Sequence, residues 1–258
     1  MALRFVDAHC HLDHDLFEGG LPQVVAKAKA AGVDRVVCAG SSPAANDKVL
    51  RFRREFAGFV FAAAGISPHD AGKISKNALV AELGRLSQWA KAGELCAIGE
   101  IGLDWHYFKE RNERDAQEHV FREQLSLAEK VCLPVVVHTR KAEEAVFEVL
   151  EEFPAVRVML HCFLKPALAR KAASKGWMVS LPTLKSDSVE KIAGKIPLER
   201  LLCETDSPFL WKNEAGVDAR NEPANVIFAY KRIAAARKAS LEHVAEKVTQ
   251  NAEKFFLI

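Results

Sequence analysis

Apolar runs of five to eight residues recur along the whole chain, and amphipathic segments separate them. We expect eight strands, over residues Leu3–Ala8, Arg35–Gly40, Phe59–Ile66, Leu95–Ile101, Pro134–His138, Arg157–His161, Trp177–Leu181 and Arg200–Glu204. Most of these runs are almost continuously hydrophobic, which is typical of parallel strands that are covered on both faces. Eight strands in alternation with helices predict an α/β fold, the (β/α)8 or TIM barrel.

The segments between the strands carry apolar residues at helical spacing. One helix is indicated by Leu21, Val24, Val25 and Ala28, and Gly32 follows as a stop signal. Further helices are indicated by Leu79, Leu83 and Leu86, by Phe121, Leu125, Ala128 and Cys132, by Ala142, Ala145, Val146, Val149 and Leu150, and by the segments 224–236 and 240–256. Ser240 is the expected cap of the last helix. Because no linker rich in proline, glycine or serine divides the chain, we expect one domain over residues 1–258.

Length and charge narrow the function classes. The 258 residues carry a formal net charge of +2, which argues against a protein that coats nucleic acid with positive charge. A nucleic-acid enzyme with a local basic cleft stays compatible with this balance.

No run reaches the roughly 18 apolar residues of a membrane helix, and the start of the chain shows no signal-peptide pattern. The six cysteines form no CxxC pair, which favours reduced cysteines in a cytoplasmic protein; the oligomeric state has no signal here.

Ionisable side chains follow six of the eight expected strands. His9 and His11 are two positions apart on an extended chain, so both can point to one side and bind one divalent cation. In a (β/α)8 barrel the reactive groups gather where the strands end. The set at these strand ends is His9, His11, Glu100, His138, His161 and Asp206.

Four histidines and two carboxylates exceed the needs of one tetrahedral ion, so we expect two divalent cations about 3.5–4 Å apart. Glu100 is central in the strand order and is the best candidate for a bridging ligand. Two divalent ions would outweigh the two carboxylates in charge, attract an anionic substrate and stabilise a metal-bound hydroxide. Ligands of this type accept Mg, Mn or Zn.

Other polar residues lie near these strand ends, and most of them have both a functional and a structural interpretation. His69 lies further out in the loop after the third strand. Asp104 and His106 could support the metal ligands or pack within their loop. Arg220 and Asn221 precede a helix start, where they could hold a phosphate or cap the helix.

Taken in order, these residues resemble the TatD family of metal-dependent deoxyribonucleases, in the amidohydrolase-like superfamily. The motifs are Asp7-Ala8-His9-Cys10-His11, Gly99-Glu100-Ile101-Gly102-Leu103-Asp104, Pro134-Val135-Val136-Val137-His138-Thr139-Arg140, His161-Cys162-Phe163, Glu204-Thr205-Asp206-Ser207-Pro208, Arg220-Asn221-Glu222-Pro223 and Asn251-Ala252-Glu253-Lys254-Phe255-Phe256. They span nearly the whole chain.

The resemblance implies a role for each matched residue. One metal would be bound by His9, His11, Glu100 and Asp206, and the second by Glu100, His138 and His161. Asp206 would also take the proton from the attacking water. Arg220 and Asn221 would match the motif on the phosphate side.

The loop after the third strand departs from the family pattern. The family usually has Gly-x-His-Pro-His, whereas this chain has Gly65-Ile66-Ser67-Pro68-His69. A serine can donate one hydrogen bond to a phosphate oxygen, but it cannot carry charge. We therefore expect Ser67 and His69 to contact substrate with an altered preference, while metal binding is retained.

We expect a metal-dependent phosphodiester hydrolase that acts on DNA, as an exonuclease with a hydroxide activated by two metals. The low net charge favours binding of strand ends or single strands in a cleft. The alternative is a hydrolase of amide or ester bonds, in small molecules or aminoacylated RNA, on the same metal site. A binding module without catalysis has only the change at Ser67 in its favour.

Overall fold

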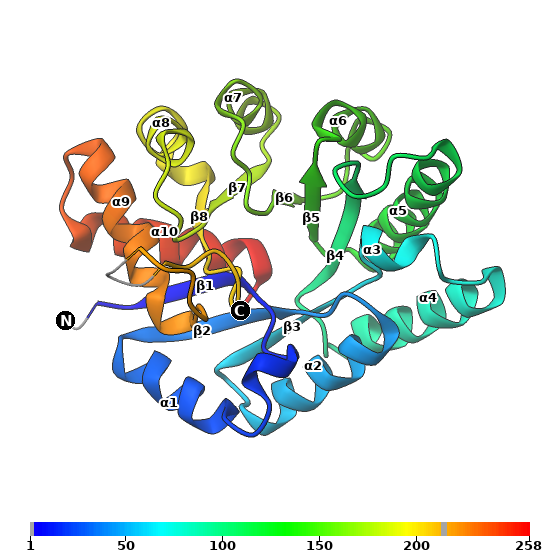
Figure 1. Ribbon diagram of the computed structural model, residues 1–258, viewed down its shortest axis with the longest axis horizontal. Coiled ribbons are helices and arrows are strands. Elements are labelled where there is room, and N and C mark those ends of the chain that lie inside the picture. Colours follow the sequence, from blue (N-terminus) through cyan, green and yellow to red (C-terminus); the bar gives the residue numbers. More distant parts are fainter. Residues whose placement is uncertain (1–2, 213–215) are drawn as a thin grey trace. The chain divides into compact units, whose positions relative to one another are not determined.

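Eight strands form one sheet in sequence order in the computed structural model, which describes residues 3–212 and 216–258 (Figure 1). The strands are β1 (Phe5–Cys10), β2 (Val33–Ala39), β3 (Val60–Ala64), β4 (Ala97–Asp104), β5 (Val135–Arg140), β6 (Val158–Leu160), β7 (Met178–Leu181) and β8 (Leu201–Cys203). The pairing is parallel, and β1 also contacts β8. The predicted (β/α)8 barrel is confirmed.

Helices alternate with these strands. They are α1 (Leu21–Ala30), α2 (Pro43–Glu55), α3 (Pro68–Ala71), α4 (Lys76–Lys91), α5 (Arg111–Val131), α6 (Glu143–Glu151), α7 (Pro166–Ser174), α8 (Asp187–Lys195), α9 (Ile227–Arg237) and α10 (Leu241–Phe256). Three short 3-10 segments are η1 (Asp15–Phe17), η2 (Leu198–Arg200) and η3 (Pro223–Val226). None of the helices in the described ranges is long and apolar enough to cross a membrane.

The chain divides into two compact units. The first consists of Met1–Cys38, Phe56–Phe61 and His161–Ile258, and the second of Ala39–Glu55 and Ala62–Leu160. Each unit combines segments that are far apart in the sequence, so neither is one continuous stretch of chain. A single domain over residues 1–258 stays a prediction.

Helices α9 and α10 hold β1 in the first unit. Tyr230 of α9 is fully buried, and its ring lies 4.9 Å from that of Phe5. Its hydroxyl accepts a hydrogen bond from the Val6 amide at 3.0 Å and donates to the Val6 carbonyl at 3.1 Å. Burial raises the pKa of Tyr230. Together with α10, which packs on β1 and β8, these contacts fix the strand that carries His9 (Figure 1).

Buried amides hold the loop after β3 in the second unit. Gln124 of α5 accepts a hydrogen bond from the Ile66 amide at 2.7 Å and donates to the Ile66 carbonyl at 3.0 Å. Asn46 of α2 makes the same pair of bonds with Gly65, at 3.1 and 3.0 Å. Since buried backbone groups need such partners, these two side chains fix the backbone that leads to His69.

Two strands contain an extra residue next to a predicted metal ligand. The pairing register shifts over residues 7–10 of β1 and 98–101 of β4. In each case an advance of three residues along the strand is matched by an advance of two along its neighbour. A bulge of this kind bends the strand and re-aims its side chains. His9 and Glu100 lie in these bulges, inside β1 and β4, whereas the sequence pattern placed them at the strand ends.

The predicted helices are present with small corrections. Leu21, Val24, Val25 and Ala28 are the buried face of α1. The segment expected as a helix over 224–236 begins with the 3-10 turn η3.

The predicted cap of the last helix is confirmed, and the predicted position of one cysteine is wrong. Ser240 caps α10 by accepting a hydrogen bond from the His243 amide. Cys132 was expected on the buried face of α5, but it lies just beyond that helix, exposed and in the left-handed conformation at φ 57°. All six cysteines are free, as expected.

Gly102 gives a direct test of the β4–β5 packing. A Cβ atom at this position would collide with the carbonyl oxygen of His138. We expect Gly102→Ala to lower the free energy of unfolding by about 2 kcal/mol or more in urea denaturation, because the backbone must shift. The matched control is Gly84→Ala in α4, where nothing lies within 4 Å and stability should rise by about 0.5–1 kcal/mol. Similar effects of the two variants would contradict this packing.

Candidate metal centre

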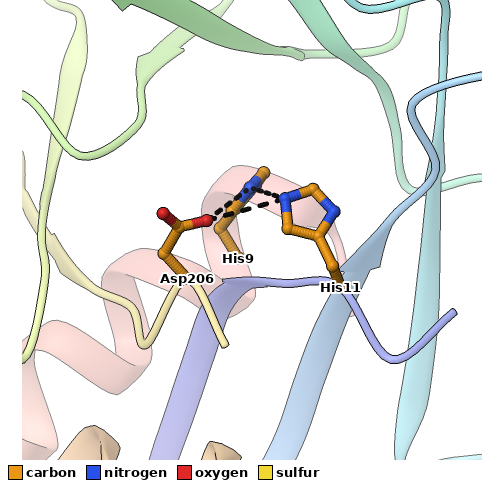
Figure 2. A group of neighbouring side chains, drawn as sticks. All are labelled: His9, His11 and Asp206. Carbon is orange, nitrogen blue, oxygen red and sulfur yellow. Dashed lines mark hydrogen bonds and ion pairs between the residues drawn. The ribbon is translucent and has the colours of Figure 1, made fainter. Parts of the chain in front are cut away.

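Three potential ligand atoms converge in the first unit. Figure 2 shows the imidazoles of His9 and His11 turned toward the Asp206 carboxylate. The two Nε2 atoms lie 3.1 Å apart, and each lies 3.5 Å from Asp206 Oδ1. Ligands about 2.1 Å from one ion are about 3.0 Å apart at right angles and about 3.4 Å apart at the tetrahedral angle. The spacing of the three atoms therefore fits one bound cation.

The backbone ties Asp206 to the strand that carries the two histidines. The Asp206 amide donates to the His9 carbonyl at 3.0 Å, and the His11 amide donates to the Ser207 carbonyl at 2.7 Å. Asp206 has a φ of 53°, in the left-handed region that aspartate tolerates better than most residues. The segment after β8 thus continues the pairing with β1 and brings a carboxylate to the histidines.

Asp7 fixes the same segment through hydrogen bonds with Thr205. It is fully buried, and its Oδ1 accepts a hydrogen bond from the Thr205 amide at 2.9 Å. Its Oδ2 accepts from the Thr205 hydroxyl at 2.6 Å, and that hydroxyl in turn accepts from the Ser207 amide at 3.1 Å. Burial raises the pKa of Asp7 to about 8, against the opposing effect of the hydrogen bonds from Thr205 and His9. Asp7 is therefore a structural support of the Asp206 position.

His161 follows β6 and joins the same group. Its ring stacks on that of His9 with centroids 4.1 Å apart, and its Nδ1 lies 3.7 Å from Glu204 Oε1. The other Glu204 oxygen accepts a hydrogen bond from the Ser180 hydroxyl. Burial raises the pKa of the Glu204 carboxyl. Glu204 is thus a buried carboxyl group beside the imidazole of a predicted ligand.

The second unit holds the other two predicted ligands. His138 Nδ1 lies 2.7 Å from Glu100 Oε1, and His138 Nε2 lies 3.1 Å from Asp104 Oδ2. The same Asp104 oxygen lies 3.3 Å from His69 Nε2, so His69, Asp104 and His138 form a second group with the spacing of cation ligands. His69 is thus closer to the ligands than its position in the loop suggested.

Asp104 supports His138 and His69 and also holds its own loop. Its Oδ1 accepts hydrogen bonds from the amides of His106 and Tyr107, at 2.9 and 3.2 Å. Burial raises the pKa of Asp104, but the hydrogen bonds of His138 and His69 outweigh burial and hold the pKa well below the usual range. Both interpretations of Asp104 therefore apply, whereas His106 contributes only its backbone to these bonds.

The four residues predicted to contact substrate differ in exposure. The side chain of His69 is 45% exposed and that of Arg220 is 42% exposed. Ser67 retains only 3% exposure at the start of α3, the helix that carries His69. Asn221 is fully buried.

Arg220 and Asn221 also bond within the protein. Arg220 donates to the Leu16 carbonyl at 2.8 Å and to Glu222 Oε1 at 2.6 Å. The Asn221 amide nitrogen donates to the Thr205 carbonyl at 2.8 Å and to the Thr183 hydroxyl at 3.1 Å. Asn221 therefore supports the segment that carries Asp206. Substrate contact by any of the four residues stays a prediction.

The six predicted ligands are divided between the two compact units. The first unit holds His9, His11, His161 and Asp206, and the second holds Glu100 and His138. Metal binding by these residues stays a prediction. The sequence reasoning gave no role to Asp7 and Glu204, although each precedes a predicted ligand by two positions, the spacing that places two side chains on one side of an extended chain.

Thr205 tests the support of Asp206. Thr205→Val keeps the shape of the side chain but leaves Asp7 Oδ2 and the Ser207 amide without their hydroxyl partner. We expect the free energy of unfolding to fall by about 1–3 kcal/mol, because buried polar groups lose hydrogen bonds. Thr205→Ser retains the hydroxyl and should stay close to the wild type in urea denaturation. A Val variant as stable as the Ser variant would contradict this role.

Comparison with known proteins assigns the family. A model of the TatD related DNase family matches residues 6–257. YabD of Bacillus subtilis, named as an uncharacterized metal-dependent hydrolase, is 33% identical over 98% of this chain and 98% of its own length. A protein of Cronobacter turicensis named 3'-5' ssDNA/RNA exonuclease TatD is 29% identical over 97% of each chain.

A solved structure supports the fold. The TatD homologue YJJV from Escherichia coli matches with a TM-score of 0.90 at 24% sequence identity, over 100% of both chains. The family match over nearly the whole length confirms the resemblance that the strand-end motifs indicated. The chain belongs to the TatD related DNase family and is a hydrolase.

Proposed function

We propose that this protein is a metal-dependent nuclease that hydrolyses phosphodiester bonds of DNA from strand ends. The observation that carries the proposal is the convergence of His9 Nε2, His11 Nε2 and Asp206 Oδ1 at separations of 3.1 and 3.5 Å, which fit a cation. Membership of the TatD related DNase family supports the reaction class, and the name of the Cronobacter relative supports an exonuclease.

We propose one centre with two divalent ions. In a (β/α)8 barrel the catalytic groups come from the ends of several strands and gather at one face. All six proposed ligands belong to a strand or lie within three residues of its end. One ion would be held by His9, His11, Glu100 and Asp206, and the other by Glu100, His138 and His161. Glu100 would bridge them, and the nitrogen and oxygen ligands suit Mg, Mn or Zn.

The residues of the chain have separate tasks in this proposal. Bound cations would supply a water of lowered pKa and would stabilise charge on the phosphate. Asp206 Oδ1 faces the two imidazoles, and its second oxygen turns away from them in Figure 2. We assign Oδ1 to the cation and the second oxygen to the proton of the attacking water, as general base. The hydrogen bond between Asp104 and His138 orients that imidazole, and Glu204 lies beside the imidazole of His161.

Exposure divides the proposed substrate contacts into two kinds. Since His69 and Arg220 are nearly half exposed, they can reach a phosphate directly. Asn221 is buried and acts by holding the Thr205 segment in place, whereas Ser67 is buried at the N-cap of α3 without a side-chain capping hydrogen bond. The net charge of +2 suits capture of a strand end at such a local site. A cytoplasmic location also stays a prediction.

The function is tested by degradation of end-labelled DNA. We expect the metal-loaded protein to shorten single-stranded or double-stranded oligonucleotides, and a chelator to abolish this activity because the ligands alone cannot activate water. Parallel assays on a nitrophenyl phosphodiester and a nitrophenyl ester separate a nuclease from an amide or ester hydrolase. Hydrolysis of the ester without any degradation of DNA would contradict the proposal.

The bridging role of Glu100 has its own test. Glu100→Ala should lower the bound metal from two ions to one or none and reduce turnover more than about 100-fold, beyond the cost of losing an outer partner. Metal content is measured by mass spectrometry of the desalted protein. The control is Glu152→Ala, which removes a surface carboxylate paired with Arg122 and should leave both quantities unchanged. Two bound ions in the Glu100 variant would refute the bridge.

A further inference from the structure

Exposed aromatic side chains are few in the described ranges of the chain. Tyr107 is 59% exposed, Phe209 is 46% exposed and Phe228 is 38% exposed. Single apolar residues at a surface are common and need no function. An exposed ring next to the proposed site, in contrast, can contact a bound substrate.

Phe209 lies near His11, one of the proposed ligands of the first unit. Its ring centroid is 6.2 Å from that of His11 and 5.3 Å from that of His14. In the sequence it follows the proposed general base Asp206 by three positions, and its amide donates to the Asp206 carbonyl at 2.9 Å. The ring and the carboxylate thus belong to one tight turn.

The backbone around Phe209 is fixed on both sides. The Pro208 carbonyl accepts a hydrogen bond from the Asn221 amide at 2.9 Å, and the Leu210 carbonyl accepts from the Thr183 hydroxyl at 3.4 Å. The backbone on both sides of the solvent-exposed ring is therefore fixed by hydrogen bonds. A surface that is ordered before binding loses little conformational entropy when a ligand stacks on it.

A cation lies in the same surface region. His14 Nδ1 accepts a hydrogen bond from the Leu16 amide at 3.2 Å, and Arg220 donates to the Leu16 carbonyl at 2.8 Å. Phe209 contacts this His14 ring. An aromatic face for bases combined with cations for the backbone is how single-stranded nucleic acids are bound.

We propose that Phe209 stacks on the nucleobase next to the scissile phosphate and so selects an unpaired base. This inference rests on the proposed nuclease function and adds to it the side chain that contacts the terminal base. A base inside a duplex has neighbours on both faces, whereas the terminal base of a single strand or a frayed end can offer a face to the ring. Phe209 is thus a contact for single-stranded ends.

Removal of the ring tests the proposal. We expect Phe209→Leu to lower kcat/KM on a single-stranded, end-labelled oligonucleotide by roughly 5- to 100-fold, the range of one base–aromatic stack. Phe209→Trp should retain the activity because it keeps an aromatic face. Phe228→Leu is the matched control: its ring is similarly exposed but packs on Trp211 instead, and the variant should keep the wild-type activity.

A modified substrate separates stacking from a structural role. Replacement of the terminal thymidine by 5,6-dihydrothymidine removes the flat face of the base and keeps the phosphate. The kcat/KM of the wild type should fall on this substrate by about the same factor as Phe209→Leu lowers it on the normal strand. The kcat/KM of the Leu variant should be the same on both substrates.

Two results would overturn the stacking role while the nuclease function stands. One is a wild type with the same kcat/KM on both substrates, together with a Leu variant whose kcat/KM lies below the wild-type value by the same factor on each. The other is full activity of the Leu variant on the normal strand. A metal-loaded wild type that degrades neither oligonucleotide overturns the nuclease function and the stacking role together.

Discussion

Hydrogen bonds between β1 and the segment after β8 hold His9, His11 and Asp206 together. The amide of Asp206 donates to the His9 carbonyl, the amide of His11 donates to the Ser207 carbonyl, and buried Asp7 accepts two hydrogen bonds from Thr205. Because the first and last strands of the sheet contact each other, ligands nearly two hundred residues apart come within 3.5 Å. A change in this pairing would displace the carboxylate and both imidazoles at once.

The sequence predicted the fold and the identity of the clustered residues well, because both depend on local patterns. The eight strands follow from apolar runs, and His9, His11 and Asp206 follow from the rule that strand ends carry the chemistry. The exact strand positions of His9 and Glu100 did not follow, since a bulge depends on the register with the neighbouring strand. The same holds for Cys132, whose left-handed conformation ends α5 one residue earlier than the apolar spacing indicated.

Burial separates roles that the sequence motif treats alike. Arg220 and Asn221 are neighbours, yet the guanidinium is nearly half exposed and the amide is buried with hydrogen bonds to Thr205 and Thr183. Ser67 and His69 differ in the same way. A substitution of the family histidine by Ser67 therefore concerns a buried helix start, while the imidazole that can meet a phosphate is retained.

We propose that ligands in or just after β1, β4, β5, β6 and β8 bind a single pair of ions. Anomalous diffraction from crystals grown with Mn²⁺ tests it most directly. We expect two peaks about 3.5–4 Å apart, one beside His9, His11 and Asp206 and the other beside His138 and His161, with Glu100 between them. A lone peak beside His9 and His11, or two peaks too far apart to share Glu100, would contradict it.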